Sequence, residues 1–137
     1  MEPKGDAIVD IPRERLGFFG GPGKMLLPSP ATVASVIDKV PARQLITTNL
    51  LCRKLTQLFD VRGTCPVTTQ KALQAVAHDP GSEAPYWRVV KADGGLIAQF
   101  PGGAERQAER LRKEGFTLDT RGKAPKVANF RERLVPV

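Results

Sequence analysis

Residues 47–78 read TTNLLCRKLTQLFDVRGTCPVTTQKALQAVAH, and this stretch decides the fold. Its first part spaces leucines and Phe59 along one apolar helix face, with Thr47 or Thr48 available as the cap. Residues 60–66 are rich in turn-forming residues, and a second helix runs from Val67 or Thr68 to His78. Two helices joined by such a turn are typical of a helix-turn-helix, whose second helix enters the major groove of DNA.

Upstream of this stretch, the sequence predicts one more helix. Ser29 is suited to cap it and Pro30 to begin it, and apolar residues then recur at helical spacing until Pro41. Residues 1–28 are interrupted by glycine and proline, which predicts an extended arm without a core of its own.

Downstream, the pattern changes to strands. Residues 86–90 are aromatic and β-branched, Asp93-Gly94 is a strong hairpin signal, and residues 96–100 fit the return strand. A polar helix over 104–114 follows, with Gly115 as its C-cap, and residues 119–137 form a loosely packed basic tail. We therefore predict a mainly α fold with a small β-hairpin, a winged helix-turn-helix, over residues 29–118.

The composition bounds the class of protein. A length of 137 residues with 41% hydrophobic and 26% charged residues fits one globular domain. No apolar run approaches the ~20 residues that cross a bilayer, and the first ten residues lack an apolar signal core, so we expect a cytoplasmic protein without membrane contact. Two cysteines and the single His78 are too few for a metal site, and we expect no cofactor.

The net charge of +7 favours a polyanionic partner. Residues 1–24 carry four positive and four negative side chains, which cancel. Between residues 39 and 78 the cations face only Asp60, and they are Lys39, Arg43, Arg53, Lys54, Arg62 and Lys71. We expect them to gather on one side of the fold, around the second helix of the pair.

Residues 85–96, PYWRVVKADGGL, resemble the active-site segment of the alkylguanine-DNA alkyltransferases. That family reads Pro-Cys-His-Arg-Val-Val there, followed by a short turn with Asp-Gly and Leu. Residues 102–105 and the helix ending in Glu114-Gly115 look like its Gly-Gly loop and closing helix, and residues 36–48 resemble its Ile-Pro-x-Gly-x-Val-Thr-Thr-Tyr segment. The resemblance covers about residues 32–116.

The departures from this family bear on activity. Tyr86 stands at the reactive cysteine and Trp87 at the histidine that, with a buried carboxylate, activates it. A phenol and an indole cannot replace a thiolate and its base, so we expect no alkyl transfer. Asn49 stands where the family has a nucleotide-rotating Tyr, and Gln70 or Lys71 at its intercalating Arg. Alkyltransferase-like proteins also lack the cysteine, bind lesions, and pass the flipped base to other repair machinery.

Two sets of residues are predicted to bind DNA. The first carries hydroxyls, amides and cations on the helix-turn-helix pair, suited to phosphates and base edges: Arg43, Thr47, Thr48, Asn49, Arg53, Lys54, Thr68, Thr69, Gln70, Lys71 and Gln74. The second would form a pocket for a flipped base: Tyr86, Trp87, Arg88, Gly102 and Gly103. Strand alternation would put Tyr86 and Trp87 on opposite faces, and the resemblance gives Arg88 a structural role.

Neither cysteine is predicted to be catalytic. Cys52 lies beside an apolar helix face and is expected to be a small buried hydrophobic residue. Cys65 precedes a helix N-terminus, which favours a lowered thiol pKa, but no histidine lies near it in the sequence to serve as a base.

We predict a monomeric, non-enzymatic protein of alkyltransferase-like type that binds double-stranded DNA, recognises alkylated or flipped bases, and meets repair proteins. One alternative is a winged-helix DNA-binding regulator without lesion recognition. A second is a protein–protein adaptor that uses the apolar residues Phe18, Phe19, Met25, Leu26 and Leu27.

Overall fold

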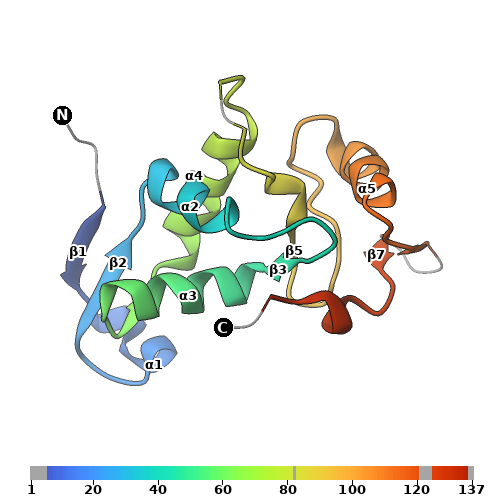
Figure 1. Cartoon of the computed structure of the whole chain (residues 1–137). Helices are drawn as coiled ribbons and strands as arrows, with labels where there is room; N and C mark the ends of the chain where they lie inside the picture. The colour runs from blue at the N-terminus through green and yellow to red at the C-terminus, as the bar shows by residue number, and fades with distance from the viewer. Residues whose placement is uncertain (1–5, 82, 121–124, 136–137) are drawn as a thin grey trace.

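The computed structural model describes residues 6–81, 83–120 and 125–135 (Figure 1). The outermost residues of the predicted arm and part of the predicted tail lie outside these ranges, as does Ser82. The α-helices of the described chain are α1 (Leu16–Phe19), α2 (Pro30–Ile37), α3 (Thr48–Phe59), α4 (Pro66–Ala77) and α5 (Gly103–Lys113). The short 3₁₀ helices are η1 (Arg13–Arg15), η2 (Tyr86–Arg88) and η3 (Phe130–Arg133).

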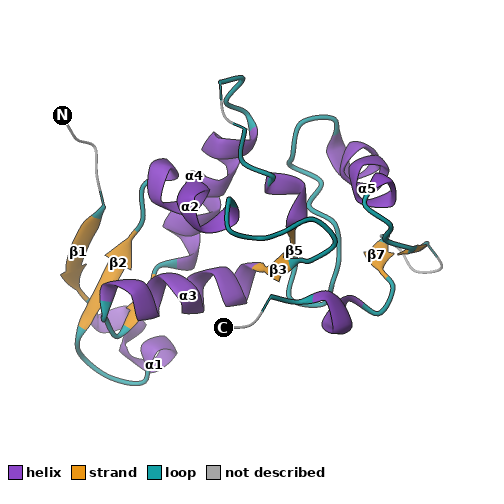
Figure 2. Ribbon diagram, viewed as in Figure 1, coloured by secondary structure: helices purple, strands orange, loops and turns teal. Residues whose placement is uncertain are grey.

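The strands are short and form small separate sheets among the helices (Figure 2). They are β1 (Ala7–Asp10), β2 (Lys24–Leu27), β3 (Ile46–Thr47), β4 (Gly63–Thr64), β5 (Val89–Val90), β6 (Leu118–Asp119) and β7 (Lys126–Val127). The fold is thus a mixture of helices and small sheets rather than mainly α with one hairpin.

The prediction of an arm without a core is wrong for the described part of residues 1–28. β1 runs antiparallel to β2, with Ala7 opposite Leu27, and β2 runs parallel to β4, with Met25 opposite Gly63. Met25 is buried with Ile11 and Cys65 in a small apolar cluster. Gly20, Gly21 and Gly23, three of the glycines that suggest an arm in the sequence, adopt positive φ angles in the turn between β1 and β2.

The predicted helices around the main core are confirmed. The Ser29 hydroxyl accepts a hydrogen bond from the Thr32 amide at 3.2 Å, with Pro30 in the first turn of α2. Of the two threonines that could cap α3, Thr47 does so, accepting from the Leu50 amide at 3.3 Å. The apolar faces of α2, α3 and α4 meet in one buried cluster that includes Ile37 and Leu73.

The predicted hairpin over residues 86–100 is wrong. The Asp93-Gly94 turn forms, with the Gly94 amide bonded to the Lys91 carbonyl at 2.8 Å. However, β5 pairs in parallel with β3, with Ile46 opposite Val89, and the segment after the turn pairs with residues 125–127. Both residues of β5 are buried, as is usual for a parallel strand covered on both faces.

The predicted loose tail is packed where the structure describes it. β6 and β7 pair antiparallel, and Val127 and Phe130 enter a second buried cluster with Leu45 and Leu111. The Leu45 amide bonds to the Arg133 carbonyl at 2.8 Å, which ties the last described residues to β3. Within the described ranges, every helix is too short or too polar to cross a membrane.

Candidate nucleic-acid interface

A groove of about 760 Å³ lies between α3 and α4, with α1 against part of it. Its lining follows α3 from its first turn to its last and takes in the N-terminal half of α4. The lining residues are Phe18, Phe19, Thr48, Asn49, Leu51, Cys52, Arg53, Thr56, Gln57, Thr64, Pro66, Thr69, Gln70 and Leu73. We call this surface the α3–α4 groove.

The groove brings together five of the residues predicted to contact DNA. Thr48, Asn49 and Arg53 come from α3, and Thr69 and Gln70 from α4. Asn49, Arg53 and Gln70 are exposed, so two amides and a guanidinium face solvent between the helices. This set can offer hydrogen bonds to base edges and one positive charge to a phosphate.

Two of the predicted contacts are wrong because the hydroxyls are used inside the protein. Thr47 is 2% exposed, and its side chain caps α3. Thr69 is 3% exposed, and its hydroxyl donates to the Cys65 carbonyl at 2.8 Å, within the first turn of α4. Neither hydroxyl is available to a phosphate.

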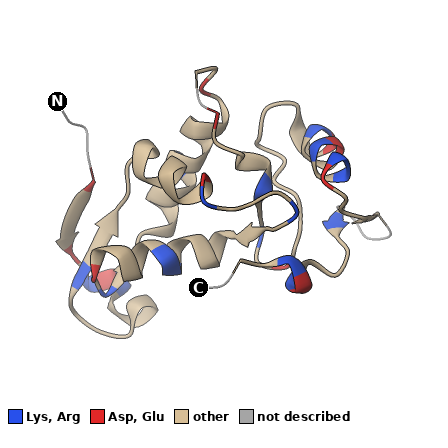
Figure 3. Ribbon diagram, in the orientation of Figure 1, with Lys and Arg blue, Asp and Glu red and all other residues tan. Residues whose placement is uncertain are grey.

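The remaining predicted contacts lie outside the groove lining. Arg43 and Lys71 are exposed, in the loop before β3 and on α4, whereas Lys54, Thr68 and Gln74 are half-buried. Figure 3 shows Lys and Arg on α3 and in the loop between α2 and β3, but also on α5 and η3. The positive charge is therefore not gathered around α4, although this helix does present an exposed polar face.

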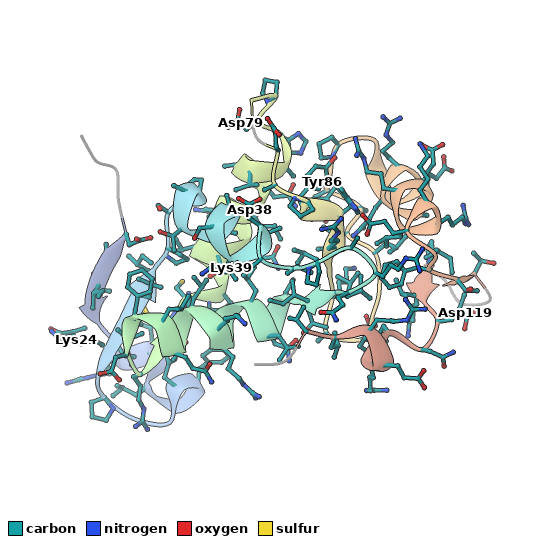
Figure 4. The ribbon with its side chains drawn as sticks, in the orientation of Figure 1. Lys24, Asp38, Lys39, Asp79, Tyr86 and Asp119 are labelled. Atoms are coloured by element: carbon teal, nitrogen blue, oxygen red, sulfur yellow. The ribbon has the colours of Figure 1, made fainter. Side chains whose placement is uncertain are left out.

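The five residues predicted to form a base pocket do not converge on one cavity. Tyr86, labelled in Figure 4, packs edge-to-face on Phe100 at 5.0 Å and on Trp87 at 5.4 Å between ring centroids. Trp87 lines a shallow hollow of about 210 Å³ against α5. Gly102 and Gly103 begin α5 with φ angles of 80° and 73°, outside both this hollow and the α3–α4 groove. Because Tyr86 and Trp87 lie in a 3₁₀ turn, strand alternation does not apply to them.

Arg88 instead anchors a buried polar cluster. Its Nη2 lies 2.6 Å from Glu114 Oε2, and its Nη1 donates to the Val40 carbonyl at 2.7 Å. The Trp87 indole N–H donates to the same Glu114 oxygen at 3.1 Å. These contacts tie η2 to α5 and to the end of α2, which agrees with the structural role expected for Arg88. We call Trp87, Arg88, Gln107 and Glu114 the Arg88 cluster.

Glu114 is held as a carboxylate in this cluster. Burial raises its pKa, but the hydrogen bonds from Arg88 and Trp87 and the charge of Arg88 outweigh burial, so the pKa is below its ordinary value. The Arg88 and Glu114 side chains are only 15% and 14% exposed. The Trp87 indole has an N–H that donates but no nitrogen that accepts a proton. Glu114 therefore cannot act through the Trp87 ring as a general base that takes a proton from a nucleophile.

Gln107 is a buried member of this cluster that the sequence analysis missed. It is 1% exposed, its Oε1 accepts from the Ile97 amide at 2.7 Å, and its Nε2 donates to the Val89 carbonyl at 2.8 Å and the Trp87 carbonyl at 3.0 Å. A signal was present in the sequence, because Gln107 falls at helical spacing between Ala104 and Leu111 on the inward face of α5.

The thiol pKa values of the two cysteines are shifted in opposite directions. Burial raises the pKa of the Cys65 thiol, but hydrogen bonds from Thr68 and Arg15 lower it by a larger amount. The thiol pKa is therefore below its ordinary value, as predicted. Burial raises the pKa of Cys52. No cluster of three or more His, Cys, Asp or Glu residues suited to a metal ion occurs within residues 6–81, 83–120 and 125–135.

Comparison with solved structures identifies the fold. The described chain is similar in fold to solved structures of alkyltransferase-like proteins, two of which are from S. pombe. One is Atl1 in complex with damaged DNA containing O6-carboxymethylguanine, which is 20% identical over 79% of this chain and 94% of its own, with a TM-score of 0.62. The other, an S. pombe ATL in complex with DNA, is 19% identical over the same shares, also with a TM-score of 0.62. No family model matches the sequence. No curated protein matches it either.

Proposed function

We propose that this chain is a DNA-binding protein of alkyltransferase-like type that does not transfer alkyl groups. The observation that carries the proposal is the α3–α4 groove, in which Asn49, Arg53 and Gln70 face solvent between two helices. Support comes from the shared fold with Atl1, which was solved on damaged DNA. The net charge of +7 favours the same class of partner.

We infer that α3 and α4 form the helix-turn-helix pair. They are joined by residues 60–65, and α4 begins at Pro66 with its N-terminal half on the groove. In this arrangement Gln70 lies on the solvent side of α4, where a recognition helix meets DNA. We assign the wing, by chain order alone, to the segment around the Asp93-Gly94 turn, where the strand residues pair with β3 and with residues 125–127 rather than as a hairpin.

The absence of alkyl transfer in this proposal rests on η2. Tyr86 stands at the position of the nucleophile by resemblance, and its ring is half-buried against Phe100 rather than open to a groove. Trp87, at the position of the base, donates its N–H to Glu114. A nucleophile needs a partner that accepts its proton, and an indole offers none.

Recognition of alkylated bases is the finer part of the proposal, with a general DNA binder as the other outcome. A monomer in the cytoplasm that meets repair proteins belongs to the same proposal. The adaptor alternative is weakened, since Met25 and Leu26 are buried and only Phe18 of its apolar residues is strongly exposed.

Fluorescence anisotropy with labelled duplexes tests the proposal. We expect binding to a matched duplex that weakens steeply as salt rises, because phosphate contacts release counterions. Tighter binding to the same duplex with one O6-alkylguanine would support lesion recognition, whereas equal binding would leave a general DNA binder. No binding at about 100 µM protein in low salt would contradict DNA binding altogether.

The absence of alkyl transfer is tested separately by mass spectrometry of the intact protein. Its mass after incubation with the alkylated duplex should stay unchanged.

A further inference from the structure

Phe18 is the most exposed large apolar side chain of the described residues, at 72% exposure, and it lines the α3–α4 groove. We propose that its ring is a stacking platform for an unpaired nucleobase at the α1 side of this groove. The proposal deepens the proposed function and rests on it. The resemblance over residues 32–116 does not reach α1, so the platform belongs to the N-terminal segment that precedes it.

The backbone that carries Phe18 is fixed to the connection between α3 and α4. Arg62 Nε donates to the Phe19 carbonyl at 3.0 Å, and its Nη2 donates to the Gly20 carbonyl at 2.6 Å. The Phe19 ring occupies the space above Gly63, where a Cβ atom would lie 2.3 Å from it. Phe18 and Phe19 meet edge-to-face with centroids 4.9 Å apart. An aromatic ring anchored in this way loses little conformational entropy when a ligand stacks on it.

The neighbours of Phe18 favour a nucleotide over an apolar peptide. Phe18 shares a second small hollow with Pro66, the first residue of α4, and so lies at the N-terminal end of that helix. In the groove beside it, Arg53 supplies a positive charge, and Asn49 and Gln70 supply amides. Among the described residues that line the groove, Arg53 alone carries a charge. This positive charge complements a phosphate. A ring, a cation and amides together match the base, phosphate and base edge of one nucleotide.

Stacking on an aromatic side chain accepts any base, because every base has a π-face. The platform therefore predicts a preference for DNA with an unpaired base over fully paired DNA, whatever the sequence. The second hollow places Glu14 and Arg15 of η1 together beside Phe18, so their opposite charges cancel there, whereas Arg53 in the groove has no acidic residue among the described residues of the same lining. We therefore place the phosphate at Arg53.

Two duplexes test this inference, one fully matched and one with a single bulged 2-aminopurine. Wild type should bind the bulged duplex more tightly and quench its fluorescence by stacking. Phe18→Ala should lose the quenching and about ten-fold in affinity for the bulged duplex, with little change for the matched one. Phe18→Trp should retain both properties. Ile8→Ala serves as the matched control, since Ile8 is an exposed apolar residue on β1 outside the groove lining.

The outcomes separate this inference from the proposed function. If Phe18→Ala quenches and binds the bulged duplex like wild type, while Arg53→Ala weakens binding to both duplexes, stacking is wrong and DNA binding stands. If wild type binds neither duplex, both proposals are wrong. Thermal melting of each variant establishes that it is folded, which we expect for Phe18→Ala because its ring is largely outside the core.

Discussion

Polar side chains are used in opposite ways at the two ends of this molecule. In the α3–α4 groove, Asn49, Arg53 and Gln70 face solvent. In the Arg88 cluster, Arg88 and Glu114 are mostly buried and bonded to each other, to a backbone carbonyl and to the Trp87 indole. The exposed side chains can still form hydrogen bonds to a ligand, whereas the buried side chains form theirs within the protein and join η2, α2 and α5.

The region that most resembles the alkyltransferases is not the region with exposed polar side chains. The motif of residues 85–90 carries the most specific part of that resemblance, yet its arginine and the residue at the histidine position hold the fold together. The groove, where the resemblance is looser, carries the exposed polar chemistry. A substitution in the Arg88 cluster should therefore change stability, and one in the α3–α4 groove should change binding.

The largest effect is expected from Arg88→Ala. It leaves the buried Glu114 carboxylate without its cation and the Val40 carbonyl without a donor, which should lower the free energy of unfolding by about 3 kcal/mol. Chemical denaturation measures this loss. Arg106→Ala is the matched control, because its 3.7 Å pair with Glu109 is more than half exposed and should contribute less than about 0.5 kcal/mol. Equal costs for the two variants would mean that the Arg88 cluster does not hold the fold.

A slightly smaller loss is expected from Gln107→Leu. The leucine fills a similar volume but leaves the Ile97 amide and the Val89 carbonyl buried without their partner, so we expect a cost of about 2 kcal/mol. The exposed Gln99→Leu serves as the control in the same denaturation experiment. A neutral Gln107→Leu would show that water or a backbone shift replaces these bonds.

Acid should weaken the Arg88 cluster and leave the groove helices less affected. The pKa of Glu114 is lower in the folded chain than in the unfolded chain, where it is about 4.3. Its contribution is therefore complete above that value and is lost as pH falls through the folded-state pKa. Urea denaturation at pH 7 and pH 3 should show a steeper loss for wild type than for Glu114→Gln. Parallel pH profiles would contradict the assignment.

The smallest change in free energy is expected in the groove. Arg53→Ala should leave thermal stability unchanged, weaken DNA binding by about five- to ten-fold, and lower the slope of log affinity against log salt by about one. Arg112→Ala, an exposed cation on α5, is the charge-matched control. If both arginines weaken binding equally, DNA is held by overall charge rather than by the α3–α4 groove.

Several errors of the sequence analysis share one physical cause, which is long-range pairing. The Asp93-Gly94 turn was predicted and forms, but the strand before it pairs with β3, more than forty residues earlier in the chain. The prediction of an arm failed because β1 and β2 are stabilised by pairing with each other and with β4. Thr47 and Thr69 have the side chains of DNA contacts, but their burial depends on how the helices pack.

The sequence by itself determined the helices and their beginnings, because apolar spacing and capping side chains such as Ser29 and Thr47 act within a few residues of each other. It also located the residue types suited to DNA, since charge and amide content are local properties. Only the tertiary structure decided which of these side chains reach solvent together in one groove and which, like Gln107, are buried. Burial and strand pairing depend on segments far apart in the chain, and local spacing does not encode them.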